Sequence, residues 1–266
     1  MINTLDIKQQ QLVDGYYKVG SGPKNILVMG SCRVVNYVTY LKEWNEANGN
    51  PFTVYSIDPF SWHWNIEGER TDYEAEIFRQ EHNEKLLIML KSIDIFIHEY
   101  YHNAGMFNCD KRSPKNIYWF GMSAPVDVCI PNFNDLFILY NDIIAFDMDL
   151  KRKVIQDMNS FGKVSEQVNK ELFDKSQSEL NKFYAICDKS DVPEFKEYFK
   201  RSFNSRRLWW TCNHVSKHFT LAMFELINEK FLHLDLSKGL NREHEDIFAN
   251  NITELTQYDR DWYGYK

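Results

Sequence analysis

The chain has 266 residues, a formal net charge of −7 at neutral pH and an isoelectric point near 5.7. This acidic balance excludes the broad basic surface that drives nonspecific binding to nucleic acids or anionic membranes. The length allows one large α/β domain, or such a domain with a helical insertion.

The five cysteines are expected to be reduced thiols. Their number is odd and no CxxC pair occurs, which argues against a disulfide framework and against a structural zinc site. No apolar run approaches the length of a membrane span, and the N-terminal residues lack the basic and then apolar pattern of a secretory signal. We therefore expect a cytoplasmic protein without a membrane span.

The first hundred residues predict alternating strands and helices. Apolar, β-branched runs predict the strands, and apolar residues at helical spacing predict the helices. The expected order is a strand at 25–30, a helix at 32–47, a strand at 52–57, a helix at 71–91 and a strand at 94–98. Such an order indicates a buried, mostly parallel sheet with helices on both faces, which is a three-layer α/β fold.

The rest of the chain is richer in predicted helix. Two further strands are expected at 116–120 and 126–130. From about 149 to 205 the sequence is charged and poor in glycine, and we interpret it as a helical insertion or cap on one domain that spans 1–266. A last helix is expected at 216–231, and no element is predicted in the polar, aromatic tail from 241 onward.

The sequence Gly30-Ser31-Cys32-Arg33 lies where the first predicted strand meets a helix. Gly30 permits a sharp turn, and the amides at the start of the helix favour an anion or a thiolate. Cys32 is therefore a candidate nucleophile. The alternative is that Cys32 is a small buried apolar residue, as most free cysteines are.

A second candidate is His214, in a segment that ends just before the last predicted helix. A histidine is poised to exchange protons near neutral pH, so it could act as the base for a thiol. The alternative is that His214 only packs against Trp209 or Trp210. His98 and His102 lie four residues apart beside acidic neighbours, but this spacing on a strand end is not specific, and no metal is expected.

Three short blocks resemble the capsular polysaccharide biosynthesis (WcbI-like) family, whose fold is similar to that of SGNH, or GDSL-type, hydrolases. The blocks are Gly30-Ser31-Cys32-Arg33, Cys129-Ile130-Pro131-Asn132-Phe133 and Thr211-Cys212-Asn213-His214-Val215-Ser216. The family usually has Asn before the cysteine and Pro after the Asn-His pair, where this chain has Ser31 and Val215. SGNH hydrolases carry an Asp three residues before the histidine, and Thr211 stands there, so a third triad member comes from elsewhere or is absent.

The resemblance implies an SGNH-like fold and an acyltransferase that moves an acyl group, expected to be acetyl, from coenzyme A to a hydroxyl or amine of a sugar or similar polar acceptor. Cys32 would be the nucleophile and His214 its base. Gly30, Ser31, Asn103 and Asn213 would form the oxyanion or substrate site. The phosphates of coenzyme A would need cations, for which the candidates are Arg33, Arg206 and Arg207.

Two other functions remain open from the sequence. An SGNH-like esterase or deacetylase would use the same acyl-enzyme and release the acyl group to water. A non-catalytic ligand-binding module would keep the fold and lose the chemistry.

Overall fold

The computed structural model describes residues 16–30, 33–57, 84–99, 124–132, 136–203, 205–212, 214–243, 246 and 252–265. The chain divides into two compact units. The first unit comprises Met1–Ile130, Ser190–Val192 and Met223–His244. The second unit comprises Pro131–Lys189, Pro193–Ala222 and Glu245–Lys266.

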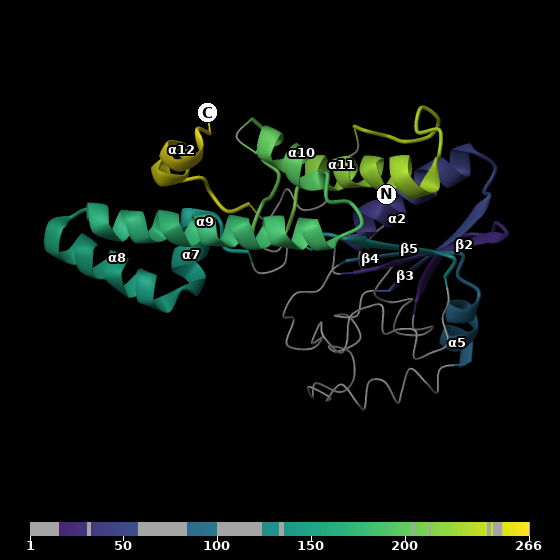
Figure 1. Cartoon of the computed structure of the whole chain (residues 1–266), viewed down its shortest axis with the longest axis horizontal. Helices are drawn as coiled ribbons and strands as arrows, with labels where there is room; N and C mark the ends of the chain where they lie inside the picture. Colours follow the sequence, from purple (N-terminus) through teal and green to yellow (C-terminus); the bar gives the residue numbers. More distant parts are fainter. Residues whose placement is uncertain are drawn as a thin grey trace. The chain divides into compact units, whose positions relative to one another are not determined.

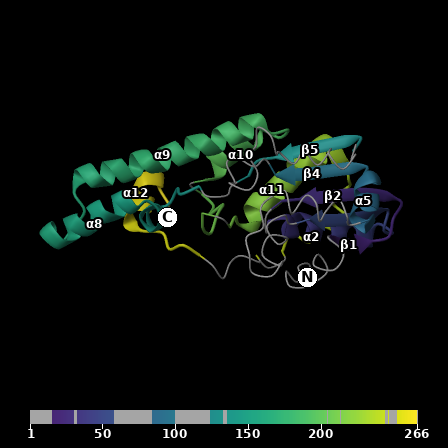
Figure 2. The same cartoon turned by 90° about the horizontal axis from the view of Figure 1, so that it is seen from below.

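A five-stranded sheet forms the first unit, with the strand order β1-β3-β2-β4-β5 (Figure 2). Strands β2, β3, β4 and β5 are mutually parallel, whereas β1 pairs antiparallel with β3. The bounds are Tyr17–Gly20 for β1, Lys24–Met29 for β2, Phe52–Ile57 for β3, Ile95–Glu99 for β4 and Val126–Ile130 for β5. This sheet confirms the predicted α/β class with a mostly parallel sheet.

The edge strand β1 was not predicted from the sequence. Its side chains alternate between half-buried and exposed positions, so it lacks the apolar run that marks a central strand. Gly20 ends the strand with φ of 76°, and a Cβ there would lie 2.6 Å from the Phe52 carbonyl oxygen. Only glycine fits this close approach of the backbone without strain.

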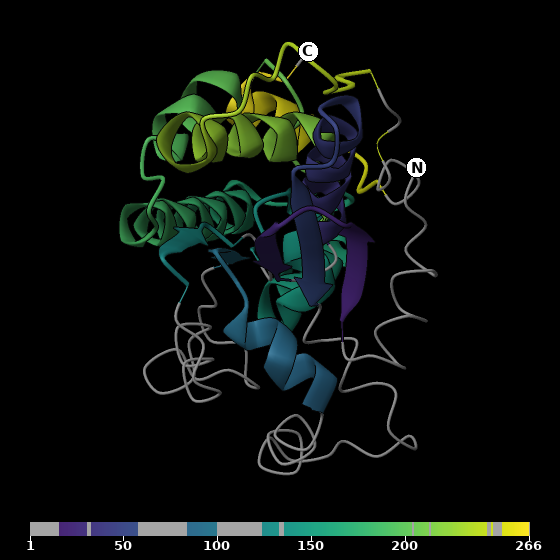
Figure 3. The same ribbon diagram turned by 90° about the vertical axis from the view of Figure 1, so that its right-hand side faces the viewer.

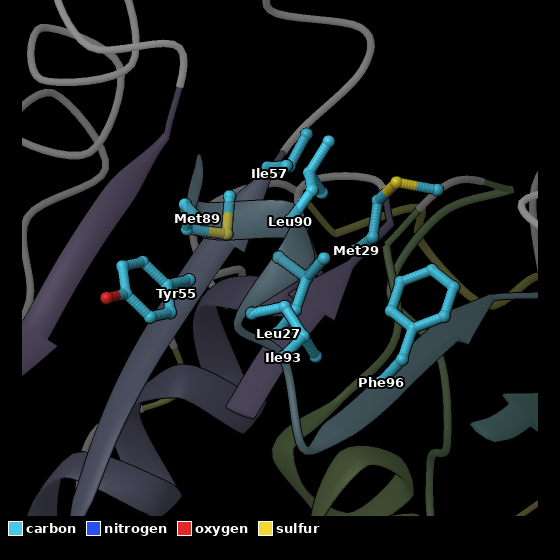
Figure 4. Packing of buried hydrophobic residues seen from close by; sticks show 8 residues of the cluster. All are labelled: Leu27, Met29, Tyr55, Ile57, Met89, Leu90, Ile93 and Phe96. Atoms are coloured by element: carbon cyan, nitrogen blue, oxygen red, sulfur yellow. The ribbon is translucent and has the colours of Figure 1, made fainter. Parts of the chain in front are cut away.

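Two helices cover opposite faces of the sheet, α2 (Val34–Ala47) and α5 (Glu84–Lys91) (Figures 1 and 3). Alternate side chains of β2, β3 and β4 face α5, because successive residues of a strand point to opposite sides. They form one apolar cluster with the end of α5 (Figure 4), whose members are Leu27, Met29, Tyr55, Ile57, Met89, Leu90, Ile93 and Phe96.

The end of α2 is tied to the start of β3 by a buried amide. Asn45 accepts a hydrogen bond from the Phe52 backbone N–H at 2.8 Å and donates one to the Phe52 carbonyl at 3.0 Å. On the same side of the sheet, Tyr40 of α2 packs against Phe224, with ring centroids 5.2 Å apart. These contacts fix α2, and so the turn that precedes it, on the sheet.

Helices make up most of the second unit, where the sequence predicted a helical insertion or cap at about 149–205. They are α7 (Tyr140–Phe146), α8 (Met148–Phe161), α9 (Glu166–Lys189) and α10 (Phe195–Ser202). Helices α8 and α9 run side by side as a hairpin (Figure 1), joined after the left-handed Gly162. The organisation into one domain with an insertion stays a prediction.

The last described helices are α11 (Lys217–Ile227) and α12 (Gln257–Tyr263). The predicted helix at 216–231 ends earlier as an α-helix, because a π-helical turn over Asn228–Leu232 follows it and closes at a left-handed His233. Helix α12 gives structure to the tail, and a capping box of Thr256 and Asp259 starts it.

The strand expected at 116–120, and the part of the helix expected at 71–83, lie outside the described residues. In the ranges that the structure covers, no helix is both long and apolar enough to cross a membrane. Within the same ranges, no group of three or more His, Cys, Asp or Glu side chains is placed to hold a metal ion.

Candidate functional site

The first candidate site lies at the carboxyl edge of the sheet, between the ends of β2 and β4. The chain leaves β2 toward β3 on one side and later returns to β4 on the other side. Open parallel sheets bind ligands where the strand order reverses in this way. Ser31 and Cys32 follow Gly30, the residue after β2, but lie outside the described residues, as does Asn103.

Gly30 closes β2 and leaves no space for a side chain. A Cβ at this position would lie 2.7 Å from Val34 Cγ1 and 2.8 Å from the Glu99 carboxylate. Real Cβ contacts are not this short, so any larger residue would push against the start of α2 and the end of β4. The sequence predicted Gly30 for a sharp turn. Gly30 is not among the described glycines with a positive φ, and the reason for glycine that the structure shows is close packing.

Arg33 and Glu99 form a buried ion pair beside this turn. Arg33 Nε lies 2.7 Å from Glu99 Oε1, and Arg33 Nη2 lies 3.0 Å from Glu99 Oε2. Their side chains are only 2% and 1% exposed. A bidentate contact of this kind fixes the orientation of both the guanidinium and the carboxylate. Arg33 therefore joins the start of α2 to the end of β4 through a buried ion pair.

Tyr37 lies one turn further along α2 and interacts electrostatically with the same pair. Its side chain is fully buried, and burial raises the pKa of its hydroxyl well above the ordinary value. The Glu99 carboxylate raises this pKa further, and the Arg33 guanidinium lowers it. The hydroxyl of Tyr37 is therefore neutral at physiological pH and is no base for a reaction at this edge.

His98 is the neighbour of Glu99 on β4 and faces the other side of the sheet. Its Nε2 lies 2.9 Å from Asp127 Oδ1, and its ring stacks on Phe96 with centroids 4.7 Å apart. Among the described residues, its Nδ1 is buried without a hydrogen-bond partner. His98 thus pairs with a carboxylate on β5. His102, four residues further along the sequence, is outside the described part.

The second candidate site is a tight turn in the second unit, which carries His214. Trp209 and Val215 form an antiparallel bridge across its base. The Trp210 N–H donates to the His214 carbonyl at 2.7 Å, and the Thr211 N–H lies 3.2 Å from the same oxygen. Asn213 belongs to this turn in the sequence, but lies outside the described residues.

Thr211 contacts His214 in two ways. Its Oγ1 lies 3.2 Å from His214 Nδ1, and it accepts a hydrogen bond from the His214 backbone N–H at 3.1 Å. The sequence had left the third triad member either elsewhere or absent. Thr211, the residue at the position of that Asp, contacts the ring nitrogen through its hydroxyl oxygen.

Two charged side chains hold this turn in place. Arg207 Nε donates to the Trp209 carbonyl at 2.9 Å, and its Nη2 donates to the Trp210 carbonyl at 3.3 Å and to the Thr253 carbonyl. Asp246 Oδ2 accepts from Trp210 Nε1 at 2.8 Å and from the Lys217 N–H, the first residue of α11, at 2.7 Å.

The predicted cofactor-binding arginines therefore differ in their surroundings. Arg33 is buried against Glu99, and Arg207 is half-buried against backbone carbonyls. Burial lowers the pKa of Arg207, although an arginine stays charged at physiological pH. Arg206 is exposed.

Three of the five cysteines are described, and each is buried: Cys129, Cys187 and Cys212. Burial raises the pKa of Cys187 to about 12, with the Asp188 carboxylate adding to the effect. Buried thiols of this kind react slowly.

Comparison with known proteins bears on the fold. No protein-family model and no curated protein matches the chain. A solved structure of WcbI, described as a novel polysaccharide biosynthesis enzyme in its native form without a disulfide bond between coenzyme A and one of its cysteines, has a similar fold. The TM-score is 0.56 at 10% identity, over 91% of this chain and 80% of WcbI. The resemblance to WcbI that the three sequence blocks predicted is therefore confirmed at the level of the fold.

Proposed function

We propose that the chain is an acyltransferase that uses a thiol to move an acyl group, expected to be acetyl, from coenzyme A to a hydroxyl or amine of a saccharide-like acceptor. The observation that carries the proposal is the reversal of strand order at β2. The segment with Cys32 follows β2 at this reversal and leads into α2, where ligands of parallel sheets bind. A helix start also favours a thiolate.

The reaction has two steps. The Cys32 sulfur attacks the thioester carbonyl while His214 accepts the thiol proton, and the carbon–sulfur bond to coenzyme A breaks as that proton passes to the leaving thiolate. The acceptor oxygen or nitrogen then attacks the acyl group on Cys32. His214 takes the acceptor proton and returns it to the Cys32 sulfur as the second carbon–sulfur bond breaks.

Other predicted residues have supporting roles in this proposal. The backbone amides of Ser31 and Cys32 stabilise the oxyanion, with Asn103 or Asn213 as a side-chain donor. Arg206 is the cation proposed for the phosphates of coenzyme A, because it is exposed, whereas Glu99 already binds Arg33. The fold shared with WcbI, which is described in connection with polysaccharide biosynthesis and coenzyme A, supports the donor and the acceptor class.

The test is to trap the acyl-enzyme. The protein is mixed with acetyl-coenzyme A, and intact and peptide mass spectrometry locate any acetyl group. Calorimetry with coenzyme A measures binding in parallel. We expect saturable binding and one acetyl group on Cys32 in wild type, and none on that peptide in Cys32→Ala.

A matched control is Cys109→Ser, which removes the other cysteine outside the described residues and should keep the acetylation of Cys32. The three buried cysteines should stay unlabelled in all variants. A folded wild-type protein that neither binds coenzyme A nor becomes acetylated would overturn the proposal. If Cys32 becomes acetylated but loses the acetyl group to water at the same rate with and without an acceptor, this would indicate an esterase instead.

A further inference from the structure

The end of β4 carries one polar side chain on each face of the sheet, and the two are paired differently. On the α2 face, the Glu99 carboxylate binds Arg33. His98 lies two residues after Phe96 on β4, so it shares the α5 face with Phe96. Within the described residues, the Nδ1 atom of His98 is buried and has no hydrogen-bond partner. The α5 face therefore has an unpaired polar atom at the edge where parallel sheets bind ligands.

Asp127 and Phe96 hold the His98 ring in one orientation. His98 Nε2 lies 2.9 Å from Asp127 Oδ1 on β5, and the ring stacks on Phe96 with centroids 4.7 Å apart. An ionised carboxylate only accepts hydrogen bonds, so Nε2 carries the proton of the neutral ring and Nδ1 keeps its lone pair. The two nitrogens lie on opposite sides of the ring, and Nδ1 therefore faces away from Asp127.

The neighbours of His98 on this face are apolar. Met29 lies opposite His98 in the register of β2 and β4. Ile57 ends β3 on the same face as Met29 and Phe96 (Figure 4). A saccharide carries many hydroxyl groups that each need a partner, whereas these side chains offer one unpaired acceptor among apolar groups. This face therefore fits an apolar chain that carries an amide or hydroxyl donor.

We propose that His98 binds the pantetheine arm of coenzyme A, with Nδ1 accepting a hydrogen bond from an amide N–H or the hydroxyl of the arm. The inference rests on the proposed function, which supplies coenzyme A as the ligand. The arm combines methyl and methylene groups with amides and a hydroxyl, which is the chemistry that this face can bind. It ends in the thiol that carries the acyl group, and β2 leads at the same edge into the segment with Cys32.

Calorimetry with coenzyme A and with its nucleotide part, which lacks the arm, tests the proposal. In His98→Gln the side-chain amide can still donate to Asp127, but no acceptor remains at the position of Nδ1. We expect this variant to bind coenzyme A about 3- to 10-fold more weakly, the effect of one neutral hydrogen bond, and the nucleotide part with unchanged affinity. The control His233→Gln makes the same substitution at an exposed histidine of the first unit and should bind both ligands like wild type.

Nitrogen NMR of the wild-type protein gives a second measurement, which does not depend on the folding of a variant. At a pH where the ring is neutral, we expect His98 to show a protonated Nε2 and an unprotonated Nδ1. The Nδ1 signal should shift when coenzyme A is added and stay in place when the nucleotide part is added.

The outcomes separate this inference from the proposed function. If coenzyme A binds but neither His98→Gln nor the Nδ1 signal responds, or if the nucleotide part is affected equally, the inference on His98 is overturned and the proposed function stands. If wild type does not bind coenzyme A, both are overturned. If coenzyme A binds through His98 but Cys32 is not acetylated, the thiol chemistry fails and the binding role of His98 stands.

Discussion

The buried pair of Arg33 and Glu99 makes a sharp prediction about stability. Glu99→Gln keeps the size of the side chain and removes its charge. One amide oxygen can still accept from Arg33 Nε, but the amide nitrogen would face Arg33 Nη2, donor against donor, across a gap that is now 3.0 Å. Both side chains are almost fully buried, so water cannot replace the lost carboxylate.

Breaking a buried pair on one side costs about 3–5 kcal/mol, a large part of the about 5–15 kcal/mol that holds a typical domain together. If the free energy of unfolding falls by about 3 kcal/mol for each molar of urea, the midpoint of urea unfolding should fall by about 1 to 2 M. Urea unfolding followed by circular dichroism measures this change. Hydrogen exchange should show the loss of protection in β2 and β4.

The matched control is Glu46→Gln, which breaks an exposed pair with Lys42 on the same unit, 3.3 Å apart. Exposed pairs contribute about 0–1 kcal/mol. If Glu99→Gln lowers the free energy of unfolding by no more than Glu46→Gln does, the argument from burial is wrong. The double variant Arg33→Met with Glu99→Leu should recover most of the loss, because apolar residues of similar size can replace a buried pair.

Three further predictions concern stability. Gly30→Ala should cost about 1–3 kcal/mol in urea unfolding, because its Cβ would overlap Val34 and Glu99, and an unchanged midpoint would contradict this packing. Burial raises the pKa of Asp142 from 3.8 to about 6, so its buried charge opposes folding above pH 6 and this penalty disappears as the pH falls toward 4. Asp142→Asn should therefore gain up to about 3 kcal/mol at pH 8 and nothing near pH 4, and a gain independent of pH would argue against this cause. Arg207→Met removes the donor to the Trp209 and Thr253 carbonyls, whereas the Trp210 carbonyl still accepts from the Thr253 N–H. The variant should lower stability by about 1–3 kcal/mol and shift the NMR signals of the His214 ring, and unchanged signals would show that Arg207 does not hold the turn around His214.

The sequence predicted the central strands well for a physical reason. Strands β2, β3 and β4 are buried along almost their whole length, so they are rich in apolar and β-branched residues and are bounded by turns. The edge strand β1 and the short helices α7 and α12 lack such a run. They owe their structure to tertiary contacts, such as the hydrogen bond from the Tyr140 N–H to Asp259, which no local pattern encodes.

The candidate site also combines local features, which the sequence predicts, with long-range contacts, which it does not. The turn at Gly30 and the Thr-x-x-His spacing are local, so the sequence drew attention to both. The partner of Arg33 is 66 residues away, at the end of a strand whose register cannot be read from the chain. Sequence reasoning therefore singled out Arg33 as a cation for a phosphate or carboxylate, with a surface ion pair as the alternative, but it could not identify Glu99 as the partner or predict that the pair is buried.

Under the proposed function, this difference favours Arg206 over Arg33 as the cation for the phosphates of coenzyme A. A phosphate on Arg33 would have to displace a carboxylate from a buried pair, and leaving that carboxylate uncompensated costs several kcal/mol. Arg206 is exposed and would incur no such penalty. We expect Arg206→Ala to weaken coenzyme A binding about 10- to 100-fold in calorimetry, as for one lost hydrogen bond to a charged group. The variant Arg33→Met with Glu99→Leu should bind coenzyme A with unchanged affinity. Weaker binding in this double variant together with unchanged binding in Arg206→Ala would show that the phosphate does break the buried pair.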